Sequence, residues 1–328
     1  MSAILRAASI CVAMALGSGV LAQTVPNSWT SEWGNTDFSK ASVNFSEIMS
    51  GGPPKDGIPA LDGASFAPAA DHFAIPDREP VITVELDGET ARAYPIRYLT
   101  WHEIVNDRIG DRPVTVTFCP LCNSAIVFDG RLNGAQFTFG VSGKLRNSDM
   151  VMYDRNTESW WQQFTGEAIV GELTGTKLTM LPSWMESFAD FKARHPDGLV
   201  MQEPNARRPY GENPYVGYDG SRTPFLYRGE NPPHGIAPLA RVVRVGDMAW
   251  PLARLTEKGE VEEAGLRLVW ASGTASALDQ RSIAASRDVG SIKVYDAETG
   301  KPVVHDVTFA FAFHAFEPEG IWHLEPGG

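Results

Sequence analysis

The sequence predicts an α+β protein rich in β-strands, made of two related β-rich units of which the second is degenerate. Three observations support this fold class. From Pro80 onward, short alternating segments rich in β-branched residues are separated by turn residues. Only a few segments have helical spacing. Residues 84–99 also resemble residues 242–255, which indicates a weak internal duplication.

The first 22 residues have the composition of a signal peptide. Arg6 supplies a positive start, and the apolar run "AASICVAMALGSGVLA" ends in small residues, with Val20 and Ala22 before the expected cleavage site. The run is too short for a lasting membrane span. We therefore expect an exported protein, periplasmic or extracellular, with no membrane span after cleavage.

The net charge argues against nucleic-acid and membrane partners. The chain carries −12, and loss of Arg6 with the signal peptide changes this to −13. An acidic surface repels phosphate backbones and anionic lipids. A small molecule, a metal ion or an exported redox partner is the expected kind of partner.

The mature chain divides into four stretches. Residues 23–80 form a lead-in rich in Pro, Gly and Ser, expected to be mostly irregular. Residues 81–200 form the first β-rich unit, and residues 201–236 form a long loop rich in Pro, Gly and Tyr. A loop of that length is usually functional or covers a neighbouring surface. Residues 237–328 form the second unit.

Within the first unit, "VITVEL" and "ETARAYPI" flank an Asp-Gly turn and predict a hairpin. The segment "RYLTWHEIVND" has helical spacing, and "PVTVTF", "AIVFDG", "AQFTFGV" and "DMVMYD" predict strands. The segment "PSWMESFADFKARHPDG" predicts a helix with Ser183 as N-cap, Glu186 completing a capping box and Pro196 as the stop.

Aligning the two proposed units shows which residues of the first unit have a counterpart in the second. Tyr94 and Pro95 match Trp250 and Pro251, and the strand ending at Cys119 matches the one ending at Ala271. In the same alignment Cys122 lies opposite Thr274. The second unit therefore lacks both cysteines, and we expect any chemistry to belong to the first.

The motif Cys119-Pro-Leu-Cys122 lies between two predicted strands and allows three interpretations. Thiol–disulfide exchange is one, although the strand expected after Cys122 disfavours a thioredoxin fold. A structural disulfide in a binding module is another. The third is a metal site. Haem attachment is excluded because Asn123 stands where histidine is required, and no nucleotide-binding motif is present.

The metal site is the preferred interpretation, with copper or zinc as the ion. Cys119 and Cys122 would be thiolate ligands, and His102 would be the third ligand because its helix leads directly into the cysteine strand. Glu103 or Asp149 would orient the imidazole or bind substrate.

A second constellation follows in residues 142–167. Asn147 and Ser148, together with Trp160 and Trp161, offer polar groups beside large aromatic rings, as a small-molecule pocket requires. Asp149 and Asp154 are candidates for an acid–base pair, with Glu103 as a further catalytic candidate.

Four segments resemble one known family. "AYPIRYLTWHEIVND", "VTFCPLCNSAIVFD", "SGKLRNSDMVMYDRNTESWWQQFTGEAI" and "GTKLTMLPS" are similar, in this order, to the domain of unknown function 3179 family, over roughly residues 55–315. The family comprises bacterial and archaeal proteins, many of them exported, with no settled activity. The resemblance implies that the His-Glu segment, the Cys-Pro-x-Cys turn and the Asn-Ser-Asp segment belong to one shared pattern. It does not choose between metal and redox chemistry.

Overall fold

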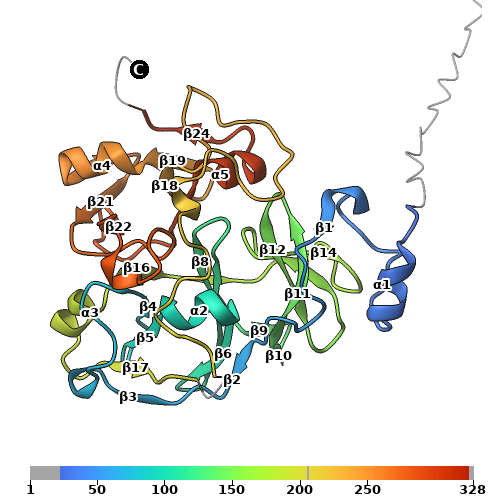
Figure 1. Cartoon of the computed structure of the whole chain (residues 1–328), viewed down its shortest axis with the longest axis horizontal. Helices are drawn as coiled ribbons and strands as arrows, with labels where there is room; N and C mark the ends of the chain where they lie inside the picture. The colour runs from blue at the N-terminus through green and yellow to red at the C-terminus, as the bar shows by residue number, and fades with distance from the viewer. Residues whose placement is uncertain (1–22, 205–206, 325–328) are drawn as a thin grey trace, which may run out of the picture.

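The computed structural model describes residues 23–204 and 207–324. The expected signal peptide, residues 1–22, lies outside the described residues. The fold is β-rich with five α-helices among the described residues, in agreement with the predicted α+β class (Figure 1). The helices are α1 (Asn27–Glu32), α2 (Ile96–His102), α3 (Phe188–Arg194), α4 (Leu252–Lys258) and α5 (Ala310–Phe316). Short 3-10 turns cover Phe45–Glu47, Ala69–Asp71, Tyr218–Gly220 and Ile283–Ala285.

Three five-stranded sheets make up the first half. One has the order β16 (Ser183–Ser187), β4 (Pro80–Val84), β5 (Arg92–Pro95), β17 (Leu199–Met201) and β3 (Phe66–Pro68). The second has the order β15 (Met180–Leu181), β8 (Ser124–Asp129), β7 (Arg112–Cys119), β6 (Ile104–Ile109) and β2 (Leu61–Asp62). The third has the order β1 (Ile48–Ser50), β11 (Phe139–Arg146), β12 (Asp149–Asp154), β13 (Trp160–Gln162) and β14 (Glu167–Val170). A small ribbon pairs β9 (Arg131–Leu132) with β10 (Ala135–Gln136).

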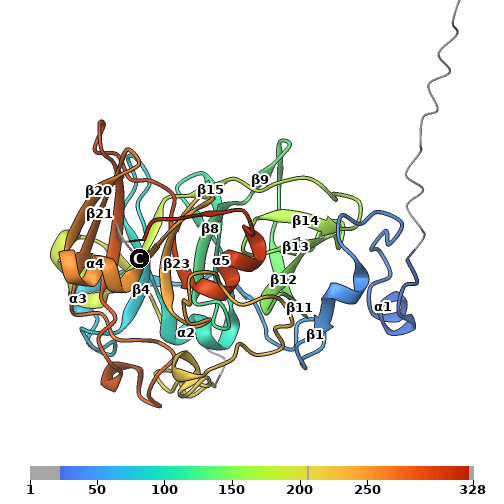
Figure 2. The ribbon, with the colours of Figure 1, turned by 90° about the horizontal axis from the view of Figure 1, so that it is seen from above.

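Two smaller sheets make up the second half. One has the order β23 (Asp306–Phe309), β18 (Arg241–Val245), β19 (Met248–Pro251) and β24 (Ile321–Trp322). The other joins β20 (Glu260–Glu263), β21 (Leu266–Ala271) and β22 (Ser291–Asp296). In Figures 1 and 2 the sheet β11–β14 lies on the opposite side of the β4–β8 strands from α4 and β21.

The two halves share one connectivity. Strands β4 and β5, helix α2 and strands β6 to β8 correspond in order to β18, β19, α4 and β20 to β22. A strand, a helix and a strand then follow in both halves: β23–α5–β24 comes directly after β22, and β16–α3–β17 comes after the additional strands β9 to β15 of the first half. The pairing repeats as well, because β16 and β23 run antiparallel to β4 and β18, while β17 and β24 run parallel to β5 and β19.

One detail of the sequence alignment is wrong. Cys119 pairs with Ser124, and Ala271 pairs with Ser291, so the counterpart of β8 is β22. The short Cys-Pro-Leu-Cys turn therefore corresponds to the long connection 272–290, and Thr274 is not the positional equivalent of Cys122.

Two predicted helices have different bounds. The helix expected from Ser183 starts only at Phe188, because residues 183–187 pair with β4 and Ser187 provides the cap by accepting a hydrogen bond from the Asp190 amide. The segment "RYLTWHEIVND" is helical only to His102, and its β-branched end enters β6. In the lead-in, β1 to β3 each pair with a strand of the main sheets.

The largest hydrophobic core joins both halves. It contains Cys119 and Cys122 together with Phe118, Trp161 and Phe309, so the second half packs directly around the cysteine turn. Among the described residues, no helix is long and apolar enough to cross a membrane.

Candidate metal and ligand site

The Cys-Pro-Leu-Cys segment is a tight turn between strands β7 and β8. The Cys122 amide donates to the Cys119 carbonyl (3.3 Å), and the Asn123 amide donates to the Pro120 carbonyl (3.2 Å). Asn123 takes a positive φ of 54°, a conformation that asparagine tolerates better than most residues. Both strands continue from the turn, so neither cysteine lies at the start of a helix as in a thioredoxin site.

Asp149 lies beside the two sulfurs. It begins β12 directly after a hairpin turn in which Asn147 and Ser148 both have positive φ. The thiols of Cys119 and Cys122 point toward the Ser148 carbonyl, at 4.0 and 3.5 Å. The two sulfurs and a carboxylate oxygen of Asp149 all lie within 4.8 Å of one another, and all three residues are buried.

The Asp149 carboxylate is held on one side only. Its Oδ2 accepts hydrogen bonds from Gln162 Nε2 (2.6 Å) and from the Phe164 amide (3.0 Å). Its Oδ1 receives no well-aligned hydrogen bond from the described residues. Burial raises the pKa of Asp149 to about 6, although the bonds from Gln162 and Phe164 oppose the rise.

Burial also raises the pKa of both thiols, that of Cys122 well above its ordinary value, and the charge of Asp149 adds to both effects. Without a bound cation the sulfurs are therefore protonated near neutral pH. A reactive redox cysteine has the opposite electrostatics, with its thiolate stabilised and accessible.

Glu103 lies at the end of α2 in an unusual backbone conformation, with φ 59° and ψ −32°. Its equivalent in the second half is Gly259, at φ 73° and ψ −43°. Both amides donate to the helix, to the carbonyls of Leu99 and Leu255. Both carbonyls accept from the second strand after the helix, from the amide of Phe118 in β7 and from that of Trp270 in β21. The first half thus carries a glutamate at a position whose geometry favours glycine.

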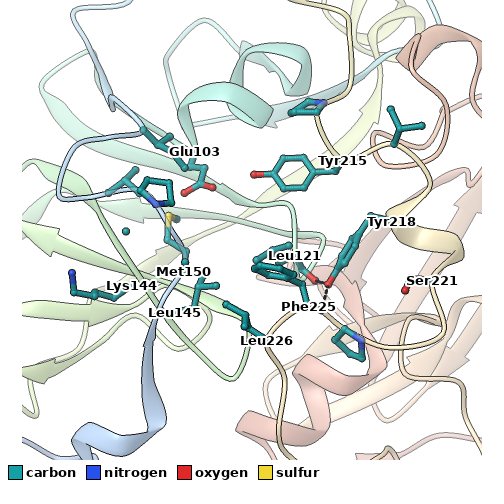
Figure 3. Close-up of a pocket in the computed structure, with 18 of the residues that line it drawn as sticks. Glu103, Leu121, Lys144, Leu145, Met150, Tyr215, Tyr218, Ser221, Phe225 and Leu226 are labelled. Atoms are coloured by element: carbon teal, nitrogen blue, oxygen red, sulfur yellow. Dashed lines mark hydrogen bonds between the residues drawn. The ribbon is translucent and has the colours of Figure 1, made fainter.

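The Glu103 carboxyl faces a tyrosine of the long loop. Figure 3 shows the Tyr215 hydroxyl directed toward it. Burial raises the pKa of Glu103 to about 8, the charge of Asp149 adds to the rise, and the interaction with Tyr215 opposes it.

A pocket of about 780 Å³ opens in front of Glu103. One wall comes from residues 51–58 of the lead-in, the second from β11 and β12, and the third from residues 214–226 of the long loop (Figure 3). Leu121 and Met150 line the pocket and are neighbours of Cys122 and Asp149 in the chain. The pocket and the cysteine–aspartate group therefore share a wall.

The structure separates the residues that the sequence analysis grouped together. His102 lies outside the group: its Nδ1–H donates to the Pro59 carbonyl (2.7 Å), and its Nε2 accepts from the Tyr210 hydroxyl (2.7 Å). Burial lowers the pKa of His102, which favours this neutral form. Asp149 takes the place that was expected for His102, and the histidine holds the long loop against α2.

The other predicted residues also separate. Asp154 accepts hydrogen bonds from the Asn156 and Thr157 amides and from Trp161 Nε1, which makes it the cap of a turn. Trp160 packs in a separate aromatic cluster with Trp29 and Trp33, so neither tryptophan of the pair lines the pocket. Asn147 and Ser148 form the turn that delivers Asp149.

The second half fixes the cysteine turn. The Cys122 carbonyl accepts from the Phe309 amide (2.9 Å) and from Thr308 Oγ1 (2.8 Å). Asp306 accepts from Ser124 Oγ and from the Ala125 amide. The sequence did not predict these residues or Tyr215; the abundance of tyrosine in the loop was the available signal for Tyr215.

One family model matches the chain. It covers residues 55–320 and is described as "Protein of unknown function (DUF3179)". The range agrees with the resemblance seen in the sequence. Comparisons with curated proteins and with solved structures gave no match.

Proposed function

The chain belongs to the DUF3179 family, and we propose that it is a metal-binding protein whose ion is held by Cys119, Cys122 and Asp149. The observation that carries this proposal is the convergence of three buried acidic side chains within 4.8 Å. Burying three such groups together is costly unless they stay protonated or bind a cation. A bound cation lowers the pKa of coordinating thiols, which offsets the rise that burial causes.

The donor set favours zinc, with copper as the second choice. Zinc accepts thiolate and carboxylate ligands in one tetrahedral site, with Zn–S distances of about 2.3 Å. Such distances place neighbouring ligand atoms about 3.8 Å apart. The observed spacing therefore needs only a small contraction. Copper(I) would use the two sulfurs mainly, because it prefers soft ligands. Three protein ligands leave a fourth position open, as in catalytic zinc sites.

Metal titration tests the proposal. Reduced, metal-free protein is titrated anaerobically with Zn(II) and with Cu(I) in competition with a chromophoric chelator, and one ion per chain is expected. Loss of a residue that only supports a ligand costs about 10–100-fold in affinity. Cys119→Ser, Cys122→Ser and Asp149→Asn, which alter direct ligands, should therefore each lose at least about 100-fold.

Two control variants make the titration specific. Asp154→Asn changes an equally buried aspartate on the same strand and should leave the affinity unchanged. His102→Gln separates the observed group from the ligand set expected from the sequence, and it should also bind normally. Unchanged affinity in Cys119→Ser and Asp149→Asn, or no stoichiometric binding, would refute the metal site.

Two alternatives from the sequence have distinct outcomes. A thiol–disulfide protein would show a reduction potential in the range of catalytic disulfides. The structure supports this less, because both sulfurs are buried free thiols with raised pKa values. In a binding module with a structural disulfide, the double variant Cys119→Ser, Cys122→Ser would lower stability and spare ligand binding.

The proposal includes export and an internal duplication. Export rests on the pattern of residues 1–22 and predicts a mature protein starting at Gln23, which N-terminal sequencing of exported protein would test. Duplication is supported by the repeated connectivity and by the matched geometry of Glu103 and Gly259. The second unit has lost the site and serves as a support for the cysteine turn.

A further inference from the structure

We propose that the pocket in front of Glu103 binds an uncharged, largely apolar small molecule that carries a hydrogen-bond-accepting oxygen, such as a ketone or quinone. Glu103 and Tyr215 would hold that oxygen at the inner end of the pocket. The inference deepens the proposed function and rests on it, because the pocket shares a wall with the metal group.

The size and lining of the pocket suit such a molecule. Small-molecule sites commonly measure about 300–1,000 Å³ and have mainly apolar walls with a few polar groups. This pocket measures about 780 Å³. Its apolar side chains come from four parts of the chain, the lead-in, the cysteine turn, strands β11 and β12, and the long loop: Ile58, Leu121, Val141, Leu145, Met150 and Leu226.

The charges around the pocket disfavour an anion. Glu103 and Lys144 are the ionisable acid and base among its lining residues. The Lys144 ammonium bonds to Glu32 of α1 at 2.8 Å and lies 5.7 Å from the centre of the Trp33 ring. Figure 3 shows its nitrogen directed away from Glu103. A carboxylate or phosphate ligand would therefore lack a free cation among these lining residues.

Glu103 and Tyr215 leave one donor for a ligand. When Glu103 carries its proton, the pair has two O–H groups beside the pocket, and an interaction between the two side chains can use only one of them. The other O–H is then available to a ligand. A buried donor without a partner is unfavourable, so an accepting oxygen in the pocket would be stabilised.

The backbone at Glu103 shows that the fold itself does not require this side chain. The equivalent turn is made by Gly259, and a non-glycine residue in so sparsely populated a conformation is strained. Strain of this kind is concentrated at functional positions. The carboxyl also points into the pocket, where a ligand can reach it.

The rim of the pocket also carries exposed apolar side chains. Val216 is 53% exposed and Phe225 is 48% exposed, and both line the pocket. An apolar molecule would meet these side chains before it reaches Glu103. They also place the long loop, rather than the sheets, at the entrance.

A matched set of naphthalene probes tests the inference. 2-Acetonaphthone has a carbonyl oxygen, 2-ethylnaphthalene has none, and 2-naphthoate is an anion of similar size. Binding to the reduced, metal-free full chain is followed by calorimetry at neutral pH. The ketone should bind about 5–10-fold more tightly than the hydrocarbon, the size of effect expected from one neutral hydrogen bond. The anion should bind most weakly.

Variants assign the preference to Glu103 and Tyr215. Glu103→Gln keeps an N–H donor and should keep the preference for the ketone. Glu103→Gly leaves the Tyr215 hydroxyl as the remaining donor and should weaken the preference. The double variant Glu103→Gly, Tyr215→Phe should abolish it while hydrocarbon binding persists, and glycine suits the backbone at this position, so both variants are expected to fold. Tyr227→Phe, on the same loop but outside the pocket, is the control and should bind as the parent does.

Three results would overturn the inference: equal affinity for ketone and hydrocarbon, tightest binding of the anion, or a preference that survives in the double variant Glu103→Gly, Tyr215→Phe. Absence of binding by all three probes would do the same. Because the assay uses metal-free protein, a failed metal titration does not change its outcome, and a failed probe assay leaves the metal titration intact.

Discussion

Replacing Glu103 with glycine should leave the protein more stable than replacing it with alanine. Both changes remove the carboxyl and its interaction with Tyr215, so these losses cancel in the comparison. Alanine keeps a Cβ at φ 59° and ψ −32°, and glycine does not. The difference between the two variants therefore depends on backbone conformation and not on the lost side-chain contacts.

The expected magnitude follows from two opposing effects. Relief of strain in this region is worth about 1–3 kcal/mol. Glycine also gains freedom in the unfolded chain, which costs about 0.4–1 kcal/mol relative to alanine. Glu103→Gly should therefore exceed Glu103→Ala in free energy of unfolding by about 1 kcal/mol.

Urea denaturation of the metal-free, reduced variants at one pH measures this difference. The reciprocal change provides the control. A Cβ at Gly259 would meet no atom within 4 Å, so Gly259→Ala tests conformation without a clash. It should destabilise the protein by about 1 kcal/mol or more.

An alanine variant as stable as the glycine variant, or more stable, would refute the reasoning. Glu103 would then be an unstrained residue, and its departure from glycine would say nothing about function. A Gly259→Ala variant with an unchanged free energy of unfolding would also refute the reasoning.

Three further predictions follow from the contacts. Burial raises the pKa of Glu79 to about 7 despite its ion pair with Arg97 (2.9 Å). Because the folded protein holds this proton more tightly than the unfolded chain does, Glu79 contributes its full stabilisation below pH 4.5 and loses it as the pH rises through 7. Between pH 4.5 and 8, the free energy of unfolding in urea should fall by up to about 3 kcal/mol less in Glu79→Gln than in the parent. An equal fall in both proteins would contradict this prediction. Thr308→Val removes a hydrogen bond to the Cys122 carbonyl and should weaken zinc binding about 10-fold in the chelator competition; parental affinity would show that the second half does not position the turn. Tyr210→Phe removes the hydrogen bond with His102 and should speed proteolysis within residues 201–236, and a parental cleavage rate would argue against that anchor.

Local pattern predicted much of the fold. Strands β4, β7, β8 and β12 follow from alternation and β-branched residues, which depend on near neighbours in the chain. The same logic failed at Ser183, where an apparent capping box belongs to strand β16. Pairing with β4 outweighed the local preference there, because the sheet satisfies the backbone of residues 183–187.

In the candidate site too, local pattern predicted some residues and only the tertiary structure placed others. Cys119 and Cys122 were identified from spacing, and Asp149 from its place in a polar segment. His102 and Glu103 are adjacent, and spacing alone favoured the histidine as the ligand. The left-handed turn at the end of α2 sends Glu103 into the pocket and leaves His102 with Pro59 and Tyr210.

By itself, the sequence determined the β-rich class, the family and the location of the cysteine turn. Each of these depends on residues close together in the chain or on motifs kept in order. Only the tertiary structure decided that Asp149 joins the sulfurs, that Tyr215 faces Glu103, and that Thr308 and Phe309 hold Cys122. These contacts join segments far apart in the sequence, and packing of the whole core selects them, so no local pattern encodes which pairs will meet.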